Sequence, residues 1–423
     1  LDEKAEIVIF ERGEHVSFSN CSMPYFLSRA IADSASLVMM DPTQFKNKYN
    51  IEVRTQHEVT SIDRSKKTIQ VKNLLTGAAC EEPYDTLILS PGGEPVMPKA
   101  IEGINNKNVF SIRNVTDIAR LDSCLRTGQV NQIAVVGGGA LGCEVAENIV
   151  LAGKQVTLIE AADQILTFFD YDMAQILHKE MLDQGISLIL KDGVKKIRND
   201  SIELVSGKIV PAQAVVMAIG IRPESTLAKN AGLEIAENGC IRVNTNYQTS
   251  DPDIYAVGDV IEVFNALTHK PMPLALAFPA QLEARAAADH IYGLQNRQKG
   301  FLGSSVLRVF NLIAACTGLN EKTAKAADFS YDTAYVIPAD KVNLMPDSHP
   351  LHLKLVFEKP TGRLLGAQAI GQNAADRRID VIAALISMNG TLEDLKNLDL
   401  CYAPVVSTVK DAVHMAALVG LNL

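Results

Sequence analysis

The sequence predicts an α/β protein with two nucleotide-binding domains built on parallel sheets, followed by a C-terminal α+β domain. Three observations support this fold class. A strand, a glycine-rich loop, a helix and a second strand follow one another over residues 132–160, which is the order of a βαβ unit. The segment EIVIFERG at 6–13 repeats the end of that unit. After residue 304 the pattern changes to alternating strands and then helices.

Length and composition agree with this organisation. At roughly 100 to 200 residues per domain, a chain of 423 residues predicts about three domains. The formal charge of −9 and scattered Lys and Arg residues predict no nucleic-acid partner, and no apolar run reaches the roughly 18 residues of a membrane span. Seven cysteines without a CxxC pair predict no disulfide framework and no metal site, and favour the reducing cytoplasm.

The first strand of the chain ends in an acidic residue, Glu11. Glu160 ends the strand of the later unit in the same way, 18 residues after Gly142 (160 minus 142). The same spacing applied to Glu11 places its glycine loop before residue 1. We therefore expect the first strand and glycine loop of this domain to lie outside the given sequence. A two-stranded edge without nucleotide is the alternative.

The glycine loop GGGALG at 137–142 fits GxGxxG through Gly137, Gly139 and Gly142. Such glycines let the backbone approach a pyrophosphate, whose charge then lies at the helix N-terminus. Glu160 has the spacing expected of the acid that binds ribose hydroxyls. A Rossmann-like domain is therefore predicted, and an acid at 160 favours NADH over NADPH because it repels a 2′-phosphate. A tight turn without ligand is the alternative.

Two later strands return to the first domain. YDTLILSPGG at 84–93 ends in a glycine turn, and DIYAVGDV at 253–260 ends at Asp259, where a parallel strand meets the ligand crevice. A helix or turn cap is the alternative role for Asp259. AVVMAIGIRP at 214–223 is a buried strand of the middle domain. The predicted ranges are 1–112 and 239–303 for the first domain, 113–238 for the middle domain and 304–423 for the C-terminal domain.

The C-terminal region combines strands with helices. LHLKLVFEK at 351–359 and LLGAQAIG at 364–371 predict a hairpin or meander. Helical patterns follow at 376–389 and 391–397, and from about 407. Few titratable groups occur in motifs there, so dimerisation is the predicted role.

Cys21 is the strongest candidate for chemistry. It stands in SFSNCSMPYFLSRAI, just before an apolar helical pattern, with polar Ser19, Asn20 and Ser22 beside it. A thiol at a helix N-terminus is biased toward the reactive thiolate. A small buried hydrophobe is the alternative.

These segments together give the chain a family resemblance over essentially its whole length. The SFxNC segment, GGGxxGxE at 137–144, AVGD at 256–259 and CTGLNEKTAK at 316–325 resemble the pyridine nucleotide-disulphide oxidoreductase superfamily. Within it, SFSNCSMPY is similar to the SFxNCGLPY of coenzyme A disulfide reductases and NADH-dependent persulfide reductases, the branch with one redox cysteine. One departure is LMPDS at 344–348, where relatives carry a Tyr-Tyr-Pro-Gly segment.

The resemblance implies roles for individual residues. Cys21 would be the redox cysteine at the flavin, and Tyr402 in CYAPVVSTVKD would reach the partner chain's site in a homodimer. Cofactor-binding roles fall to Glu11 at the FAD ribose, Asn20 beside the cysteine, Gly92 in the FAD pocket, Asp259 at the ribityl chain, Gly137, Gly139, Gly142 and Glu160 at the nicotinamide cofactor, and Glu144 near the nicotinamide ring.

The implied activity is a relay. NADH gives hydride to FAD, and the reduced flavin then reduces a sulfur bond between Cys21 and a small disulfide, persulfide or polysulfide. Coenzyme A is a further candidate ligand. An NADH oxidase or peroxidase in which Cys21 cycles through sulfenic acid is the alternative enzyme, and a redox sensor without turnover is the alternative outside enzymes.

Overall fold

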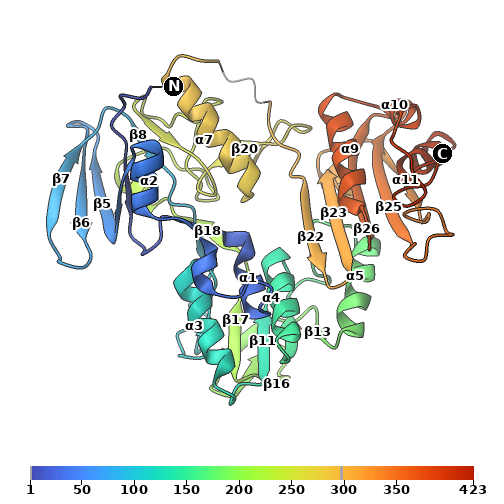
Figure 1. The fold of residues 1–423 in the computed structure, drawn as a ribbon, viewed down its shortest axis with the longest axis horizontal. Coiled ribbons are helices and arrows are strands. Elements are labelled where there is room, and N and C mark those ends of the chain that lie inside the picture. Colours follow the sequence, from blue (N-terminus) through green and yellow to red (C-terminus); the bar gives the residue numbers. More distant parts are fainter. Residues whose placement is uncertain (1, 296–298) are drawn as a thin grey trace.

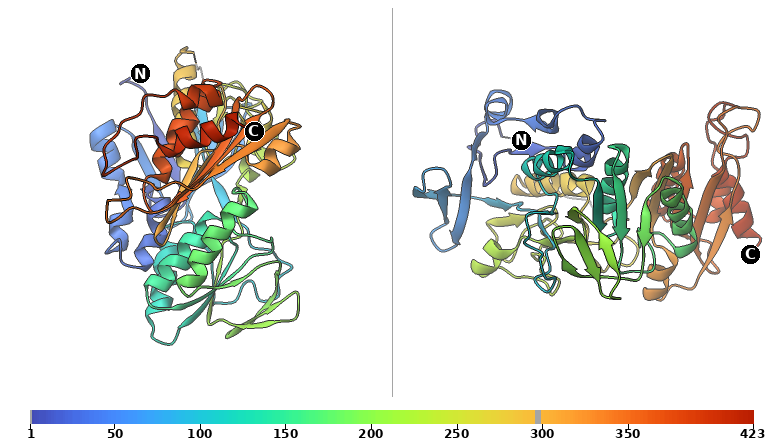
Figure 2. Two further views of the ribbon diagram at one scale, coloured as in Figure 1. Left: turned by 90° about the vertical axis from the view of Figure 1, so that its right-hand side faces the viewer. Right: turned by 90° about the horizontal axis from the view of Figure 1, so that it is seen from below.

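The computed structural model describes residues 2–295 and 299–423. The chain forms three domains: the first domain lies at one end, the C-terminal domain at the other, and the middle domain between and below them (Figure 1). Seen from below, the three lie side by side (Figure 2). Among the described residues, no helix has the length and apolar character required to cross a bilayer.

The middle domain contains a five-stranded parallel sheet with a glycine loop at its centre. Its strand order is β10-β17-β11-β12-β13, and helix α4 connects β11 to β12. Residues on both faces of β11 and β17 are buried, which explains why their sequences read as continuous apolar runs. The elements are β10 (Val109–Phe110), β11 (Gln132–Val136), β12 (Gln155–Ile159), β13 (Ser187–Ile189), β17 (Ala214–Met217), α3 (Val115–Arg126), α4 (Ala140–Leu151), α5 (Tyr171–Asp183), and an antiparallel sheet of β14 (Val194–Ile197), β15 (Ser201–Leu204) and β16 (Ile209–Pro211).

The first domain is built from two separate stretches of chain. Strand β1 pairs in parallel with β4, and β8 pairs in parallel with β19, which follows it by more than 160 residues of sequence. The elements are β1 (Val8–Glu11), β2 (Ser17–Phe18), β3 (Val38–Met40), α2 (Pro42–Tyr49), β4 (Glu52–Thr55), β5 (His57–Asp63), β6 (Thr68–Asn73), β7 (Ala79–Pro83), β8 (Leu87–Leu89), α6 (Thr226–Asn230), β19 (Ile254–Ala256), β20 (Glu262–Phe264), β21 (Pro271–Pro273) and α7 (Ala277–Ile291).

The boundaries of the middle domain follow from packing. Strand β10 lies before residue 113 yet joins the parallel sheet of the middle domain. Ala228 of α6 and Leu233 pack in the apolar core of the first domain. A short antiparallel pair, β9 (Gly93–Pro95) with β18 (Ile221–Pro223), joins the two domains. We therefore propose a middle domain that includes β10 and ends before α6.

The C-terminal domain is an antiparallel sheet covered by helices. The sheet order is β22-β23-β26-β25-β24, and the predicted hairpin is β25 with β26. All eight residues of β26 are buried, because helix α9 packs on this part of the sheet. The elements are β22 (Ser305–Val309), β23 (Leu312–Gly318), α8 (Glu321–Ala326), β24 (Tyr331–Val336), β25 (Leu351–Glu358), β26 (Leu364–Gly371), α9 (Ala375–Ser387), α10 (Leu392–Lys396) and α11 (Ala412–Leu421).

Candidate active site

Each of the three motif glycines in the loop meets a different structural requirement. Gly137 has a φ of +108°, and a Cβ there would lie 2.4 Å from the carbonyl oxygen of Ala218. A Cβ on Gly142 would lie 1.9 Å from the carbonyl oxygen of Gly137, so the helix could not approach the strand. Gly139 caps α4, and a Cβ there would meet no atom within 4 Å. The two outer glycines therefore close the turn, and the middle one leaves space in which a pyrophosphate fits.

Glu160 lies at the end of β12, against this loop. One carboxylate oxygen accepts a hydrogen bond of 2.6 Å from the N–H of Gly138, and the other accepts one of 2.7 Å from the N–H of Ala162. An ionised carboxylate has about four acceptor positions, so each oxygen keeps capacity for a ribose hydroxyl. Glu11 has a matching contact in the first domain, where it accepts a hydrogen bond of 2.6 Å from the N–H of Gly13.

The cysteine segment belongs to the first domain by sequence but packs on the middle domain. Cys21 lies in a 3-10 turn, Asn20–Ser22, directly before the short helix α1 (Met23–Leu27). Residues of α1 are buried among residues of α3 and α4, and the two helices lie beside α1 in Figure 1. The Ser28 hydroxyl donates a hydrogen bond of 2.6 Å to the Asn148 side chain of α4. The segment that follows the thiol is therefore packed on the helix that begins at the glycine loop.

Cys21 itself is exposed. Partial burial raises the pKa of its thiol, and the carboxylates of Glu144 and Asp259 raise it further, while a hydrogen bond from its own backbone N–H lowers it by less. Within the chain itself, these effects therefore work against the thiolate that the helix terminus was expected to favour. Helix α1 has only five residues, and the charges of two acids distant in sequence act on the sulfur. Asn20, beside it, is also exposed.

The turn after β19 places Asp259 near this cysteine. Gly258 precedes it with a φ of +80°, and its N–H donates a hydrogen bond of 2.6 Å to Glu283 of α7. Glu283 is only 1% exposed, so this hydrogen bond fixes the turn from the protein interior. Burial raises the pKa of Asp259, and the guanidinium of Arg113 lowers it by less. Asp259 is therefore a half-buried acid whose charge acts on Cys21.

Arg113 connects Asp259 to the Pro-Gly-Gly turn after β8. It donates a hydrogen bond of 2.9 Å to the carbonyl oxygen of Pro91 and lies 2.6 Å from a carboxylate oxygen of Glu94. Gly92, in this turn, has a φ of +72° and no atom within 4 Å of a Cβ position. Sequence reasoning missed Arg113 and Glu283, and no motif marks either. Their roles come from contacts between segments far apart in the chain.

The residues of the middle domain and of the first domain fit their expected cofactors to different degrees. The middle domain supplies a glycine cradle and the fixed carboxylate of Glu160, which fit a dinucleotide. In the first domain, Glu11 ends β1, and Gly92 and Asp259 each follow the end of a parallel strand, β8 and β19, in keeping with the flavin roles that the resemblance implies. Within the described residues no glycine loop precedes β1.

Tyr402 lies in an irregular loop of the C-terminal domain. Its side chain is 48% exposed. Nearby Val405, Val406 and Val409 are exposed as well. Among the described residues, the structure gives Tyr402 no hydrogen bond to the Cys21 segment of its own chain. The loop therefore presents an apolar surface that is available to a second chain.

A group of three acids between the middle and C-terminal domains holds a lysine. The carboxylates of Asp170, Asp172 and Glu321 lie within 4.8 Å of one another. The ammonium of Lys354, 4% exposed, lies 3.2, 2.9 and 2.5 Å from them respectively. Asp170 also accepts a hydrogen bond of 2.7 Å from Gln368. The single positive charge of Lys354 offsets part of the negative charge of this group and connects the two domains.

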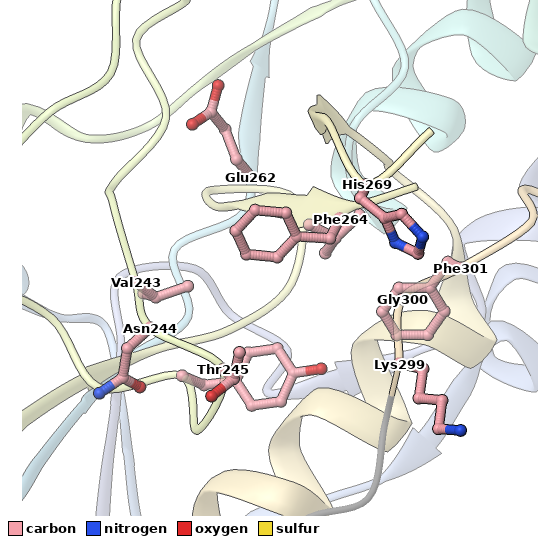
Figure 3. A pocket seen from close by; sticks show the side chains of 11 residues that line it. Val243, Asn244, Thr245, Glu262, Phe264, His269, Lys299, Gly300 and Phe301 are labelled. Carbon is pink, nitrogen blue, oxygen red and sulfur yellow. The ribbon is translucent and has the colours of Figure 1, made fainter. Parts of the chain in front are cut away.

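One further hollow lies away from Cys21. It has a volume of about 240 Å³ and lies in the first domain, between the strand β20 and the segment at 299–301. Phe264, Phe301 and His269 line it (Figure 3). None of the predicted site residues contributes to its lining.

The fold and the site together define a class of protein. The chain matches the family described as pyridine nucleotide-disulphide oxidoreductase over residues 2–333, and the dimerisation domain of that family over residues 305–413. The chain belongs to this family, which confirms the predicted resemblance and fold class. It is an oxidoreductase whose family uses FAD and NAD(P)H.

Particular relatives lie in the predicted branch. The chain is 32% identical to the coenzyme A disulfide reductase of Staphylococcus epidermidis, covering 98% of this chain and 94% of that protein. Among solved structures it is similar to the reduced CoADR-RHD of Bacillus anthracis, with 39% identity, a TM-score of 0.98, and coverage of 100% of this chain and 76% of that one. The NAD-dependent persulfide reductase of A. fulgidus matches with 32% identity, a TM-score of 0.96 and coverage of 100% and 79%.

The alternative enzyme class is represented at lower identity. The NADH-bound, water-forming NADH oxidase of Lactobacillus brevis is 26% identical to this chain, with a TM-score of 0.93 and coverage of 98% of this chain and 92% of that one. The oxidase alternative is therefore the weaker of the two.

Proposed function

We propose that this protein uses NADH and FAD to reduce a small disulfide, persulfide or polysulfide of the coenzyme A type through Cys21. The observation that carries the proposal is an exposed cysteine directly before α1, a helix that packs on α4, which begins at the dinucleotide loop. Coenzyme A is the thiol that we expect the substrate to contain, in line with the names of the relatives.

We assign cofactor binding and sulfur chemistry to different residues of the chain. Gly139 and its loop hold the pyrophosphate of the nicotinamide cofactor, and Glu160 binds its ribose. Glu11 and Asp259 hold the flavin, with Arg113 fixing Asp259. FAD, when bound, supplies the passage of two electrons from nicotinamide to sulfur. Cys21 forms a mixed disulfide or persulfide with the substrate and is released as a thiol when that bond is reduced.

NADH is the proposed electron donor in preference to NADPH. Both oxygens of Glu160 are fixed by backbone N–H groups, so the carboxylate cannot turn away from a 2′-phosphate. The repulsion between two negative charges in this position disfavours NADPH.

The active unit is proposed to be a homodimer in a reducing compartment such as the cytoplasm. Support comes from the match to the dimerisation domain and from the exposed loop of Tyr402. Tyr402 would complete the site around Cys21 of the partner subunit. All seven cysteines are free thiols, in agreement with reducing surroundings. Small molecules are the proposed substrates, without a nucleic-acid or membrane partner.

The test is anaerobic NADH oxidation by the holoenzyme, followed by the absorbance of NADH. Coenzyme A disulfide, coenzyme A persulfide and inorganic polysulfide are offered to the wild type and to Cys21→Ser. Turnover with one of them that is lost in Cys21→Ser, while flavin reduction by NADH survives, supports the proposal. Cys80→Ser is the matched control, since Cys80 is also exposed but lies on β7, in a different part of the first domain. NADH consumption only after oxygen or peroxide is admitted would establish the oxidase or peroxidase instead.

A further inference from the structure

Arg378 of α9 carries a positive charge into the interior of the C-terminal domain, where its side chain is only 2% exposed. Its guanidinium donates hydrogen bonds of 3.2 and 2.9 Å to the two carboxylate oxygens of Asp411. It donates others of 2.9 Å to the carbonyl oxygen of Asp340 and of 3.1 Å to that of Ala374, at the start of α9. The planar fork of arginine fits a carboxylate in this two-pronged geometry. One buried cation therefore holds two separate segments of the chain against a single helix.

The first segment is the loop between β24 and β25, residues 337–350. The buried carboxylate of Asp340 accepts a hydrogen bond of 3.0 Å from the N–H of His349 and one of 2.8 Å from the side-chain amide of Asn373. The N–H of Asp340 donates one of 2.9 Å to the carbonyl oxygen of His349. Asp340 thereby closes the base of the 337–350 loop, and Arg378 fixes that base to α9.

The second segment is the loop between α10 and α11, residues 397–411, which contains Tyr402 and ends at Asp411. The carbonyl oxygen of Cys401, next to Tyr402, accepts a hydrogen bond of 3.3 Å from the hydroxyl of Ser407, which is fully buried. The backbone beside Tyr402 is therefore fixed, although the tyrosine side chain is exposed.

The two loops also contact each other and present one apolar surface. The N–H of Val342 donates a hydrogen bond of 3.4 Å to the carbonyl oxygen of Pro404. Leu344 of one loop is 88% exposed, and Val409 of the other is 75% exposed. Exposed apolar surface of this kind marks a protein contact. Because the match to the dimerisation domain spans residues 305–413 and so includes both loops, the partner that fits this surface is a second copy of this chain.

We propose that Arg378 is a positioning residue for the active site of the partner subunit. By anchoring the 337–350 loop and the 397–411 loop together, it holds Tyr402 in place over the partner's Cys21. The location of that site rests on the proposed function, whereas the anchoring of the loops is independent of it. A cation that served stability alone would act within its own chain, and a positioning residue of this kind acts on the other chain.

The first test measures the two loops. Hydrogen exchange of the wild-type holoenzyme is compared with that of Arg378→Met, which removes the charged fork and keeps an apolar stem. Exchange is expected to quicken in the peptides of both loops and to stay unchanged in β26. Arg363→Met is the matched control, because Arg363 pairs with Glu358 in the same domain but outside both loops. Unchanged exchange in either loop would overturn the proposal.

The second test separates the two halves of turnover by rapid mixing. In Arg378→Met, reduction of the holoenzyme by NADH is expected to keep its wild-type rate. The reaction of the NADH-reduced holoenzyme with coenzyme A disulfide is expected to slow roughly 100-fold, the scale on which a misplacement of about 1 Å acts. Ile382→Ala, a buried position one turn further along α9, controls for general destabilisation. A wild-type rate in the second half, slowing of both halves, or an equal loss in Ile382→Ala would overturn the proposal.

The third test determines on which chain Arg378 acts. A mixed dimer of one Cys21→Ser chain and one Arg378→Met chain is isolated by two different affinity tags. The intact Cys21 of the second chain then meets loops that Arg378 of the first chain anchors, so one of the two sites of a twofold dimer is complete. About half of the wild-type activity with coenzyme A disulfide is therefore expected. Activity no higher than that of the Arg378→Met homodimer would place the effect within one chain and overturn the proposal.

These outcomes keep the inference apart from the proposed function. If no sulfur compound is turned over, the proposed function fails, while hydrogen exchange of the peptide around Cys21 still reports whether the loops cover it. Exchange there is expected to quicken in Arg378→Met, and an unchanged rate, or a wild type that is monomeric in solution, would overturn the positioning role.

Arg378→Lys replaces Arg378→Met if the latter does not fold. Its ammonium keeps the positive charge but lacks the planar fork, so the same loops and the same half of turnover are expected to be affected. Wild-type behaviour of Arg378→Lys in both measurements would overturn the proposal.

Discussion

Glu160 and Gly138 are joined by a hydrogen bond of 2.6 Å from the backbone N–H of the glycine to the carboxylate. The acid at the end of one strand is thereby fixed to the loop that follows the neighbouring strand. The two elements of a dinucleotide site are in place before any ligand arrives, so little ordering is left for binding to accomplish.

Removing this carboxylate is expected to relax the choice of nucleotide. Glu160→Ala loses charge-assisted hydrogen bonds to ribose, each worth about 1.5–3 kcal/mol, so KM for NADH is expected to rise by at least tenfold. KM for NADPH is expected to rise less or to fall. Steady-state kinetics with both nucleotides give the ratio. Asp163→Asn, an exposed acid three residues on, is the control, and an unchanged ratio in Glu160→Ala would contradict the assigned role.

The glycines of the loop are expected to fail in different ways. Gly142→Ala places a Cβ 1.9 Å from a carbonyl oxygen, and overpacking of this kind costs about 1–3 kcal/mol, so the melting temperature should fall. Gly139→Ala places its Cβ in open space and should keep the melting temperature while weakening NADH binding. Thermal melting and nucleotide titration distinguish them. Equal destabilisation by both variants would argue against the division between packing and ligand space.

Lys354 is expected to be important for stability. Lys354→Met leaves Asp170 buried without its cation, and the loss of one partner of a buried ion pair costs about 3–5 kcal/mol. Lys359→Met is the matched control, because Lys359 pairs with Asp332 at the surface and exposed pairs contribute about 0–1 kcal/mol. Urea unfolding gives both values. A similar small loss in the two variants would contradict the role of Lys354 as the ionic connection between domains.

Stability is expected to decrease as the pH rises toward neutrality. The pKa of Glu144 is raised to about 7 in the folded protein, above its ordinary value of about 4.3 in an unfolded chain. Its contribution is therefore fully present below about pH 4.3 and is lost as the pH passes through 7. Burial raises the pKa of Glu147 as well. Glu144→Gln should flatten this part of the profile in urea unfolding, and a parallel profile would show that Glu144 does not titrate there.

The regular parts of the fold were predictable because their signals are local. The glycine pattern, the apolar run of β11 and the acid at 160 lie within 30 residues of one another, and the hairpin of β25 and β26 has a turn between alternating strands. The electrostatics of Cys21 were not predictable. They depend on Glu144 and Asp259, which approach from two other segments of the chain.

Contacts that cross domains also escaped prediction. Arg113 acts through the turn at Pro91 and through Asp259, and Glu283 acts through the N–H of Gly258.

The hydrogen bond from Ser28 to Asn148 has a mechanical consequence. The segment that carries Cys21 is thereby fastened to the helix that begins at the nucleotide loop, although residues 22–136 lie between the sulfur and Gly137 in the sequence. A substitution such as Ser28→Ala would weaken this connection far from either the thiol or the glycines, so its effects would reach two predicted parts of the site at once.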